Sequence, residues 1–322
     1  MFKLKKNVII DFDSERLYVM ENGVLLYSGP AVVIRKKSET PVALAYGKQA
    51  EAQRDMVKNN EFYCHPFKNG KIADEKGARL LFRAVLRELF GKNPFLQLFV
   101  LVSGGLDEAE EQKIIQSFAL AGYNKVTLLP RPQILAKLLE YNCLYGALYM
   151  DADVSEFVLA QNGDVISAHT IGVSFTAAAE VLRNKFLADQ KLNVPLDASV
   201  RLAVEDCSLF PSDVTQLSVH GLDTVTNQKK SVIVSSRETF PCLESVYSNI
   251  TELISAVLLD EEKEFSLQVA SSGIIYLGSG TQIRGLEEFA YKRLGIPGLF
   301  AKNKTLLLEV ACSYVEKMTE NE

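Results

Sequence analysis

The chain has 322 residues, a formal net charge of −5 and a hydrophobic fraction of 48%, enough for two folded domains with separate cores. Its acidic balance and the lack of a long Lys/Arg run exclude nucleic acid as the main partner. The five cysteines are scattered and have no CxxC spacing. This pattern indicates reduced thiols in a cytoplasmic protein and argues against a zinc site or a disulfide framework.

Residues 1–145 alternate short apolar runs with helical patterns, as α/β domains do. Apolar runs between polar turns predict strands at residues 7–11, 17–20, 24–27, 95–102 and 126–129. Apolar side chains at helical spacing predict helices at residues 78–89, 107–122 and 132–141. The polar stretch between the third and fourth of these strands suits a small inserted subdomain.

A second unit begins in the same way as the first. NVIID (residues 7–11) and ALYMD (residues 147–151) are both apolar runs that end in aspartate and precede a short acidic turn and a second strand. The sequence therefore predicts two similar α/β halves that face a cleft. We expect domains at residues 1–145, with a subdomain inserted at about 32–66, and at residues 146–322, with a subdomain inserted at about 187–240.

The segment GIIYLGSGTQIRGLEEF (residues 273–289) combines a buried strand, a glycine turn and the start of a helix. Gly278 and Gly280 would allow a backbone or a flat ligand to approach closely. Thr281 can cap a helix that carries Ile283 and Leu286. Two interpretations stay open, a nucleotide held at a helix N-terminus and an ordinary strand-to-helix turn.

Four segments in the right order resemble the bacterial actin MreB, of the actin, sugar-kinase and heat-shock ATPase superfamily. They are HPFKNGKIAD (65–74), residues 102–110, GLDTVTNQKKSVIVSS (221–236) and GIIYLGSGTQIRGL (273–286). The resemblance implies an α/β, actin-like fold of two similar domains. Each would have a five-stranded sheet with flanking helices and a small inserted subdomain, around a central cleft that binds ATP and Mg.

The chain departs from the family at the two hairpins that hold phosphate. The first, like DLGTANT in MreB, is here DFDSER (residues 11–16), and the second, like DIGGGTTE, is DADVSE (residues 151–156). Asp13 and Asp153 would place carboxylates against an anionic triphosphate, at about 4 kcal/mol each for roughly 4 Å and an effective dielectric near 20. We expect Asp11 and Asp151 to remain as strand-end residues that are hydrogen-bonded to the turn backbone.

The residues that would act on ATP also differ from the family. Arg131 matches the glutamate that positions the attacking water, and an arginine cannot be a general base. Arg201 and Ala203 match the Lys and Glu that border the adenosine, so the glutamate is lost. No catalytic residue is therefore predicted. The resemblance leaves eight vestigial nucleotide-binding candidates: Asp11, Ser14, Asp151, Ser155, Gly278, Ser279, Gly280 and Thr281.

The resemblance also implies a cytoplasmic protein that assembles into filaments at the inner face of the cell membrane. Phe95 and Leu96 match the apolar membrane loop of the family, and Phe2 and Leu4 lie in a basic N-terminal segment that could add an interfacial anchor. The alternatives are strand core for Phe95 and a frayed terminus for residues 1–6.

Two functional hypotheses follow. The first is a cytoskeletal scaffold for cell shape and the cell envelope that needs no cofactor, does not hydrolyse ATP, and self-associates or co-assembles with MreB-type actins and cell-shape proteins. The second is a membrane-associated, polymerising actin that binds and hydrolyses ATP with the help of a cation. In that case Asp11, Asp13, Asp151 and Asp153 would form a metal cluster across the cleft. An adaptor of a pilus or secretion system is a third option.

Overall fold

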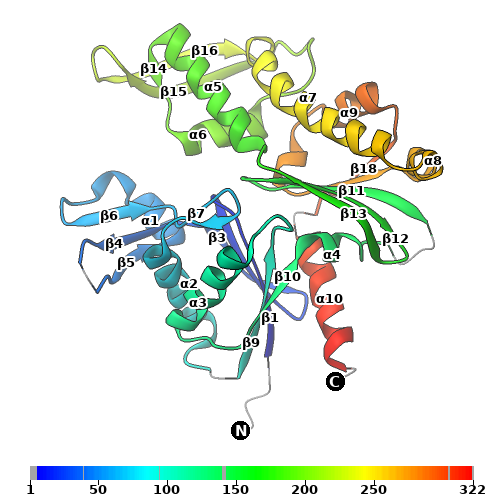
Figure 1. Ribbon diagram of the computed structural model, residues 1–322. Helices are drawn as coiled ribbons and strands as arrows, with labels where there is room; N and C mark the ends of the chain where they lie inside the picture. The colour runs from blue at the N-terminus through cyan, green and yellow to red at the C-terminus, as the bar shows by residue number, and fades with distance from the viewer. Residues whose placement is uncertain (1–5, 39, 94, 140–142, 304, 321–322) are drawn as a thin grey trace. The chain divides into compact units, whose positions relative to one another are not determined.

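The structure is a computed structural model that describes residues 6–38, 40–93, 95–139, 143–303 and 305–320 (Figure 1). The chain divides into two compact units. The first unit is Met1–Leu138 together with Thr305–Glu322, and the second unit is Leu139–Lys304.

The first unit is built on a five-stranded sheet in the order β10-β9-β1-β2-β3. Its strands are β1 (Lys6–Phe12), β2 (Arg16–Glu21), β3 (Val24–Pro30), β9 (Leu96–Val102) and β10 (Val126–Pro130). Its helices are α2 (Glu75–Phe90), α3 (Glu108–Ala121), α4 (Arg131–Leu135) and α10 (Leu306–Glu320). The insertion comprises β4 (Val33–Lys36), β5 (Ala43–Tyr46), α1 (Gly47–Ala52), η1 (Arg54–Met56) and β6 (Glu61–Cys64), and a small hairpin of β7 (Phe67–Lys68) and β8 (Lys71–Ile72) follows it.

Burial and capping explain why these segments fold as they do. Strands β1 and β9 are parallel neighbours and are almost wholly buried, so they appear in the sequence as continuous apolar runs. The Asp74 side chain accepts the N–H of Gly77 at the start of α2, and Asp107 forms a capping box at the start of α3. Between these helices the rings of Phe82 and Phe118 stack with centroids 3.9 Å apart.

The second unit repeats this plan with a sheet in the order β13-β12-β11-β17-β18. Its strands are β11 (Leu144–Met150), β12 (Ser155–Gln161), β13 (Asp164–Ile171), β17 (Ile274–Leu277) and β18 (Gly298–Phe300). Its helices are α5 (Phe175–Gln190), α6 (Leu196–Arg201), η2 (Leu202–Asp206), α7 (Ser236–Asp260), α8 (Lys263–Ser272), η3 (Ser279–Gln282) and α9 (Leu286–Leu294). A separate sheet consists of β14 (Leu192–Asn193), β15 (Gln216–Asp223) and β16 (Lys229–Ser235).

The two sheets share an irregularity as well as a strand order. The register shifts between the second and third strands of each meander, at Val19/Met20 in the first sheet and at Leu159/Ala160 in the second. Such bulges are specific features of a fold and are rarely placed by chance. They support the predicted duplication of one α/β plan.

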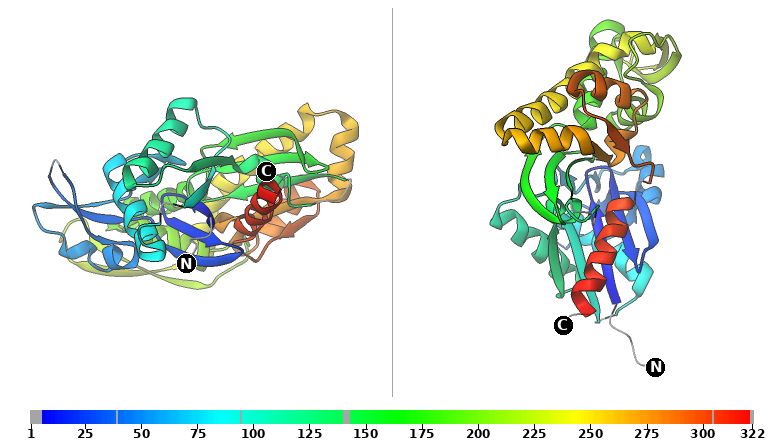
Figure 2. Two further views of the ribbon diagram at one scale, coloured as in Figure 1. Left: turned by 90° about the horizontal axis from the view of Figure 1, so that it is seen from below. Right: turned by 90° about the vertical axis from the view of Figure 1, so that its right-hand side faces the viewer.

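The C-terminal helix belongs to the first unit, although we expected the second domain to extend to residue 322. Helix α10 contacts β1, β2 and α4, and Figure 2 shows it beside the strands of the first sheet. Its buried face includes Leu307, Leu308 and Ala311. Local helical periodicity predicts such a face but cannot say which sheet it covers.

Two predicted helix boundaries were wrong. The helix predicted at residues 132–141 is the short α4, Arg131–Leu135, and part of the expected range lies outside the described residues. Thr281 lies in η3 and does not cap α9, which begins at Leu286 after Gly285 in a left-handed conformation. The Thr281 hydroxyl donates to the Gly278 carbonyl over 2.9 Å.

Helix α7 is the one segment, among the described residues, that is long and apolar enough to cross a membrane by composition. Half of that apolar window is buried inside the unit. Leu243, Ile250 and Ile254 of α7 belong to the core of the second unit. These contacts indicate a core helix.

Candidate functional site

The β1–β2 hairpin, which we predicted to match the first phosphate-binding hairpin, is hydrogen-bonded to the side chain of its own aspartate. Asp13 is buried, and its Oδ1 accepts the backbone N–H groups of Glu15 (2.8 Å) and Arg16 (2.7 Å). The Asp13 N–H donates to the Arg16 carbonyl over 2.9 Å. A turn with glycine in this position would leave such N–H groups to converge on an anion. Here a carboxylate of the chain already receives them.

The β11–β12 hairpin, which we predicted to match the second phosphate-binding hairpin, also has an aspartate side chain that accepts backbone N–H groups of the turn. Here it is the aspartate that directly follows the first strand. Asp151 Oδ1 accepts the backbone N–H groups of Asp153 and Val154, both over 2.7 Å. The Ala152 carbonyl accepts the hydroxyl groups of Ser174 and Thr176 at the start of α5. The expectation that Asp151 bonds to the turn backbone is therefore confirmed, and the turn is also fixed to a helix.

Asp11 pairs with Arg131, the residue that we predicted to stand where the resembled family has a hydrolytic glutamate. Arg131 is 1% exposed at the start of α4. Its Nη2 donates to Asp11 Oδ1 over 2.8 Å and to the Phe12 carbonyl over 3.2 Å. A buried guanidinium must be paired because an isolated buried charge is very costly. Arg131 therefore places a fixed internal cation against Asp11.

The sequence signal at Arg131 was its position between Pro130 and Pro132, directly after an apolar strand. That position does not identify the acidic partner. We predicted the loss of a general base at this position but did not predict the partner that Arg131 acquires.

The two serines of the hairpins also have contacts within the chain. Ser155 is fully buried, and its hydroxyl donates to the Val173 carbonyl over 2.6 Å. The carbonyl of Ser14 lies 3.2 Å from Nδ1 of His65, which donates in the tautomer protonated at that nitrogen. Both serines therefore contribute to the local structure of their turns.

The glycine turn of residues 278–280 is in close contact with the end of β11. Gly278 has φ +93°, and a Cβ at this position would lie 2.3 Å from the Met150 carbonyl oxygen. A Cβ on Gly280 would lie 2.2 Å from the Met150 Sδ. The Tyr247 hydroxyl donates to the Gly280 carbonyl over 2.7 Å in a buried position. These contacts account for both glycines by packing, and a ligand is not needed to explain them.

The residues that we predicted to match the adenosine border, Arg201 and Ala203, differ in burial. Arg201 is exposed at the end of α6, and Ala203 is buried in η2 among the core residues of the second unit. A glutamate in place of Ala203 could hydrogen-bond to a ribose, whereas the methyl group packs into the core.

The metal cluster stays a prediction. Asp11 and Asp13 belong to the first unit, and Asp151 and Asp153 belong to the second. Within the described part of the chain, no group of three or more His, Cys, Asp and Glu side chains is placed to hold a metal ion.

Of the four residues predicted to contact a membrane, the structure describes Phe95 and Leu96. Phe95 is 47% exposed, so the strand-core alternative was wrong for this residue, whereas Leu96 is 3% exposed and begins β9. Phe2 and Leu4 lie outside the described residues. Lys6 is aligned with Leu96 in the parallel β1–β9 pair. Strands β1 and β9 therefore begin at the same end of the sheet.

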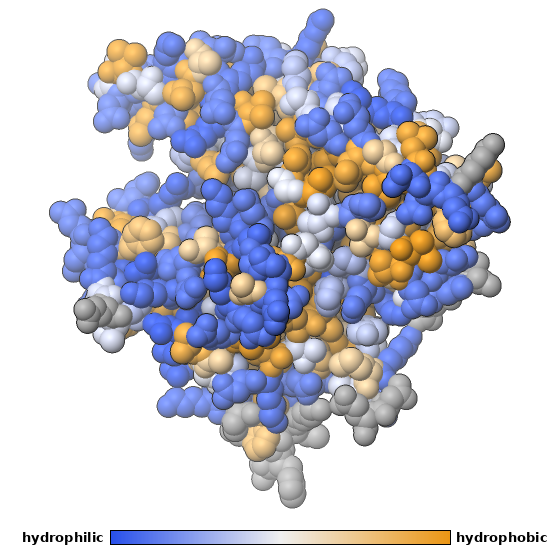
Figure 3. Space-filling view, in the orientation of Figure 1, coloured by the Kyte–Doolittle hydropathy of each residue, from blue (hydrophilic) through white to orange (hydrophobic). Residues whose placement is uncertain are grey.

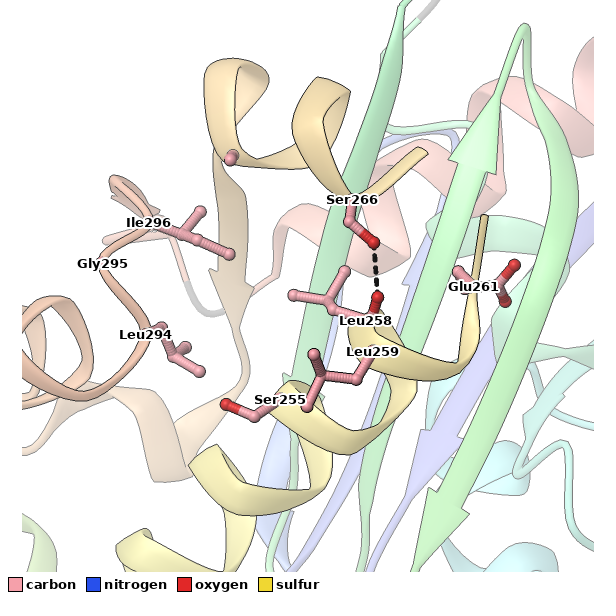
Figure 4. A pocket seen from close by; sticks show the side chains of 9 residues that line it. Ser255, Leu258, Leu259, Glu261, Ser266, Leu294, Gly295 and Ile296 are labelled. Carbon is pink, nitrogen blue, oxygen red and sulfur yellow. Dashed lines mark hydrogen bonds between the residues drawn. The ribbon is translucent and has the colours of Figure 1, made fainter. Parts of the chain in front are cut away.

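A separate apolar cavity of about 440 Å³ lies in the second unit between the end of α7, α8 and the loop after α9 (Figure 4). Its lining includes Leu258, Leu259, Leu294 and Ile296 with the polar groups of Ser266 and Glu261. Figure 3 shows hydrophobic side chains near α7 and α8 on this face. None of the predicted nucleotide residues lines this cavity.

Comparison with known sequences gives a consistent family. The family described as MreB/Mbl protein matches residues 6–321. The cell shape-determining protein Mbl of Bacillus subtilis (strain 168) is 21% identical over 294 residues, which cover 89% of this chain and 88% of Mbl. The cell shape-determining protein MreB of Pasteurella multocida (strain Pm70) is 21% identical over 297 residues, which cover 88% of this chain and 85% of that protein.

Solved structures show the same fold. MreB5 of Spiroplasma citri bound to ADP has a TM-score of 0.87 at 17% identity, with 98% of each chain covered. The MamK double helical filament has a TM-score of 0.78 at 17% identity, with 96% of this chain and 99% of MamK covered. These matches confirm the predicted actin-like fold, and together with the family match over nearly the whole length they establish that this chain belongs to the MreB/Mbl protein family.

Proposed function

We propose that this chain is a scaffolding member of the MreB/Mbl family that does not turn over ATP. The observation that carries the proposal is the buried Arg131–Asp11 ion pair, with Nη2 and Oδ1 2.8 Å apart. Hydrolysis requires a group that positions or deprotonates a water. A protonated guanidinium that donates to a carboxylate and a carbonyl does neither.

The two hairpins support the same proposal. To hold a triphosphate, the hairpins would have to release the N–H groups now bonded to Asp13 and Asp151. Asp13 and Asp153 would also bring negative charge to the phosphates, at about 4 kcal/mol each for roughly 4 Å and an effective dielectric near 20. A micromolar affinity is worth about 8 kcal/mol in total. With these N–H groups bonded to Asp13 and Asp151, the two turns do not suit a polyphosphate.

The biological role that we propose is assembly in the cytoplasm, as a filament or a co-filament that organises the cell envelope. Mbl and MreB, the relatives at 21% identity, are cell shape-determining proteins. MamK, which shares the fold, forms a double helical filament. The partners would be other copies of the chain, MreB-type actins or further cell-shape proteins.

Calorimetric titration with Mg-ATP tests the proposal. We expect no binding heat, no phosphate release and no change in Tm at 1 mM Mg-ATP. A site with a Kd of 10 μM would stabilise the protein by about 2.7 kcal/mol under those conditions. MreB5 of Spiroplasma citri, which was crystallised with ADP, is the positive control. Micromolar binding with phosphate release would instead establish an active, cation-assisted ATPase.

A variant that restores the family residues sharpens this test. Arg131→Glu combined with Asp13→Gly and Asp153→Gly removes the internal cation and both carboxylates that would oppose the phosphates. Weak Mg-ATP binding that appears in this folded variant, and is absent from the native chain, would support the proposed cause. Nucleotide-independent assembly of the native chain, measured by sedimentation and electron microscopy, is the expected positive activity.

We propose a second property, contact with the inner face of the cell membrane. The observation that favours it is the exposed Phe95 side chain, which directly precedes β9 at the end of the first sheet where β1 also begins. An exposed aromatic side chain suits the bilayer interface, and the sequence of the first six residues is basic and apolar. Co-sedimentation with vesicles, compared between the native chain and Phe95→Ser, measures this contact.

A further inference from the structure

The apolar cavity between α7, α8 and the loop after α9 has a fixed wall. Leu258 and Ile296 line it and are buried. The Ser266 hydroxyl in the first turn of α8 donates to the Leu258 carbonyl, which joins α8 to the end of α7 (Figure 4). Gly295 ends α9 in a left-handed conformation and leads the chain to Ile296. The cavity volume, about 440 Å³, lies in the range of preformed binding pockets.

Exposed leucines extend this apolar surface. Leu259 lines the cavity and is 85% exposed, and Leu267, next to the lining residue Ser266, is 60% exposed. A single exposed apolar side chain is common on folded proteins, whereas several around an apolar cavity mark a binding surface. The surface around the cavity therefore suits an occupant with apolar side chains.

The turn from α7 to α8 places negative charge beside the cavity. Its sequence, DEEKE (residues 260–264), contains four acids and one lysine. Glu261 lines the cavity, and Asp260, Glu262 and Glu264 are exposed. None of these four carboxylates forms an ion pair with a basic side chain that the structure describes. This acidic turn therefore favours an occupant that is also positively charged.

The two basic residues that precede the lining residue Leu294 do not neutralise the acidic turn. Lys292 pairs with Glu288 over 3.3 Å, and Arg293 pairs with Glu244 over 3.5 Å. An anionic lipid surface would be repelled by the acidic turn. An uncharged small molecule would use the cavity but not the carboxylates. A segment that combines apolar and basic side chains would use both.

The chain itself contains a segment of this kind. Residues 1–5, MFKLK, lie outside the described residues, and their sequence alternates apolar residues with lysines. The next residue, Lys6, begins β1 and pairs with Glu21 over 2.7 Å, so the segment is attached at a fixed point of the first unit. Five extended residues span up to roughly 17 Å. In an extended conformation Phe2 and Leu4 would share one side, and the lysines would share the other.

We propose that the cavity of one copy of the chain binds residues 1–5 of a second copy. Phe2 and Leu4 would enter the cavity, and Lys3 and Lys5 would lie at its mouth beside the acidic turn. The inference rests on the proposed self-assembly and names the two surfaces that meet. Each copy would use its N-terminal segment in one contact and its cavity in another, so the contacts would join copies head to tail in an open series. Phe95 would remain available for the proposed membrane contact.

Fluorescence anisotropy with a labelled peptide of residues 1–7, MFKLKKN, measures this contact directly. The receptor is the full chain with Phe2→Ser/Leu4→Ser, so that its own segment does not compete. We expect saturable binding, lost when the peptide carries the same two serines or when the receptor also carries Leu259→Gln. Glu262→Gln/Glu264→Gln in the receptor should weaken binding roughly five- to tenfold, the effect of two exposed charge pairs.

The matched control is Glu180→Gln/Glu205→Gln, which removes the same charge from exposed positions in α5 and η2 of the second unit. An equal loss of peptide binding in this control would overturn the proposal, since net charge alone would then explain the attraction. Equal binding of the serine peptide would overturn it as well, because that peptide keeps the lysines but cannot fill the cavity. A lack of saturable binding by the native peptide would also overturn it.

Sedimentation without lipid tests whether the occupant belongs to a second copy. The native chain should sediment at a concentration at least tenfold lower than Phe2→Ser/Leu4→Ser, because the variant no longer buries two large apolar side chains. If both chains sedimented alike, the self-assembly would stand and the proposed contact would be overturned. If the peptide bound but the native chain stayed monomeric, the proposed self-assembly itself would fail, and with it the head-to-tail contact.

Discussion

Replacing Arg131 by methionine should destabilise the first unit strongly. Methionine keeps most of the side-chain length but removes the charge, which leaves the Asp11 carboxylate, only 4% exposed, without its ion-pair partner. Breaking a buried pair by removing one member typically costs about 3–5 kcal/mol. At roughly 2–4 °C per kcal/mol for a unit of this size, the Tm should fall by about 6–20 °C.

A double-mutant cycle separates the ion pair from the packing. Arg131→Met, Asp11→Asn and the combination are compared by urea unfolding, followed by far-UV circular dichroism because the chain has no Trp. The combined variant buries no net charge at this position, so its loss of stability should be smaller than the sum of the single losses. The difference isolates the interaction between Arg131 and Asp11.

Two results would refute this reasoning. If Arg131→Met lost less than about 1 kcal/mol, the guanidinium would not be a necessary internal cation. If the losses of the two single variants were additive, the 2.8 Å contact would not couple them energetically. Either result would remove the main support for the proposal that the Arg131–Asp11 ion pair prevents ATP hydrolysis.

Gly278→Ala should be more destabilising than Gly280→Ala, by roughly 1–3 kcal/mol, because a Cβ at Gly278 meets the β11 backbone at φ +93°, whereas one at Gly280 meets a flexible methionine side chain. Urea unfolding of the two variants checks the order, and equal losses would contradict it. Asp74→Asn should lower stability at neutral pH but not in acid. Burial favours the neutral Asp74 carboxyl, but the Gly77 N–H and the Arg35 guanidinium outweigh burial and lower its pKa. An acid with a lowered pKa stabilises the fold above its ordinary pKa, and this contribution is lost as pH falls through the lowered value. The difference in unfolding free energy between the native chain and Asp74→Asn should therefore shrink below about pH 4, and a constant difference would refute the assignment.

The sequence by itself determined the features that depend on local pattern. Apolar runs such as NVIID and ALYMD predicted the two copies of the α/β plan because a buried strand needs consecutive apolar side chains. The acidic residues Asp13 and Asp153 were visible as losses of glycine in the turns. Arg131, at the position where the resemblance implies a hydrolytic glutamate, was visible in the same way.

The tertiary structure decided the features that depend on residues far apart in the chain. Arg131 lies 120 positions from Asp11, so no local pattern could identify this pairing. The apolar face of α10 would suit either sheet, and only its contacts place it on the first. Phe95 reads as the start of a strand but is exposed because pairing begins one residue later. Side-chain type and spacing fix what a segment can form, whereas the partner it packs against follows from the folding of the whole unit.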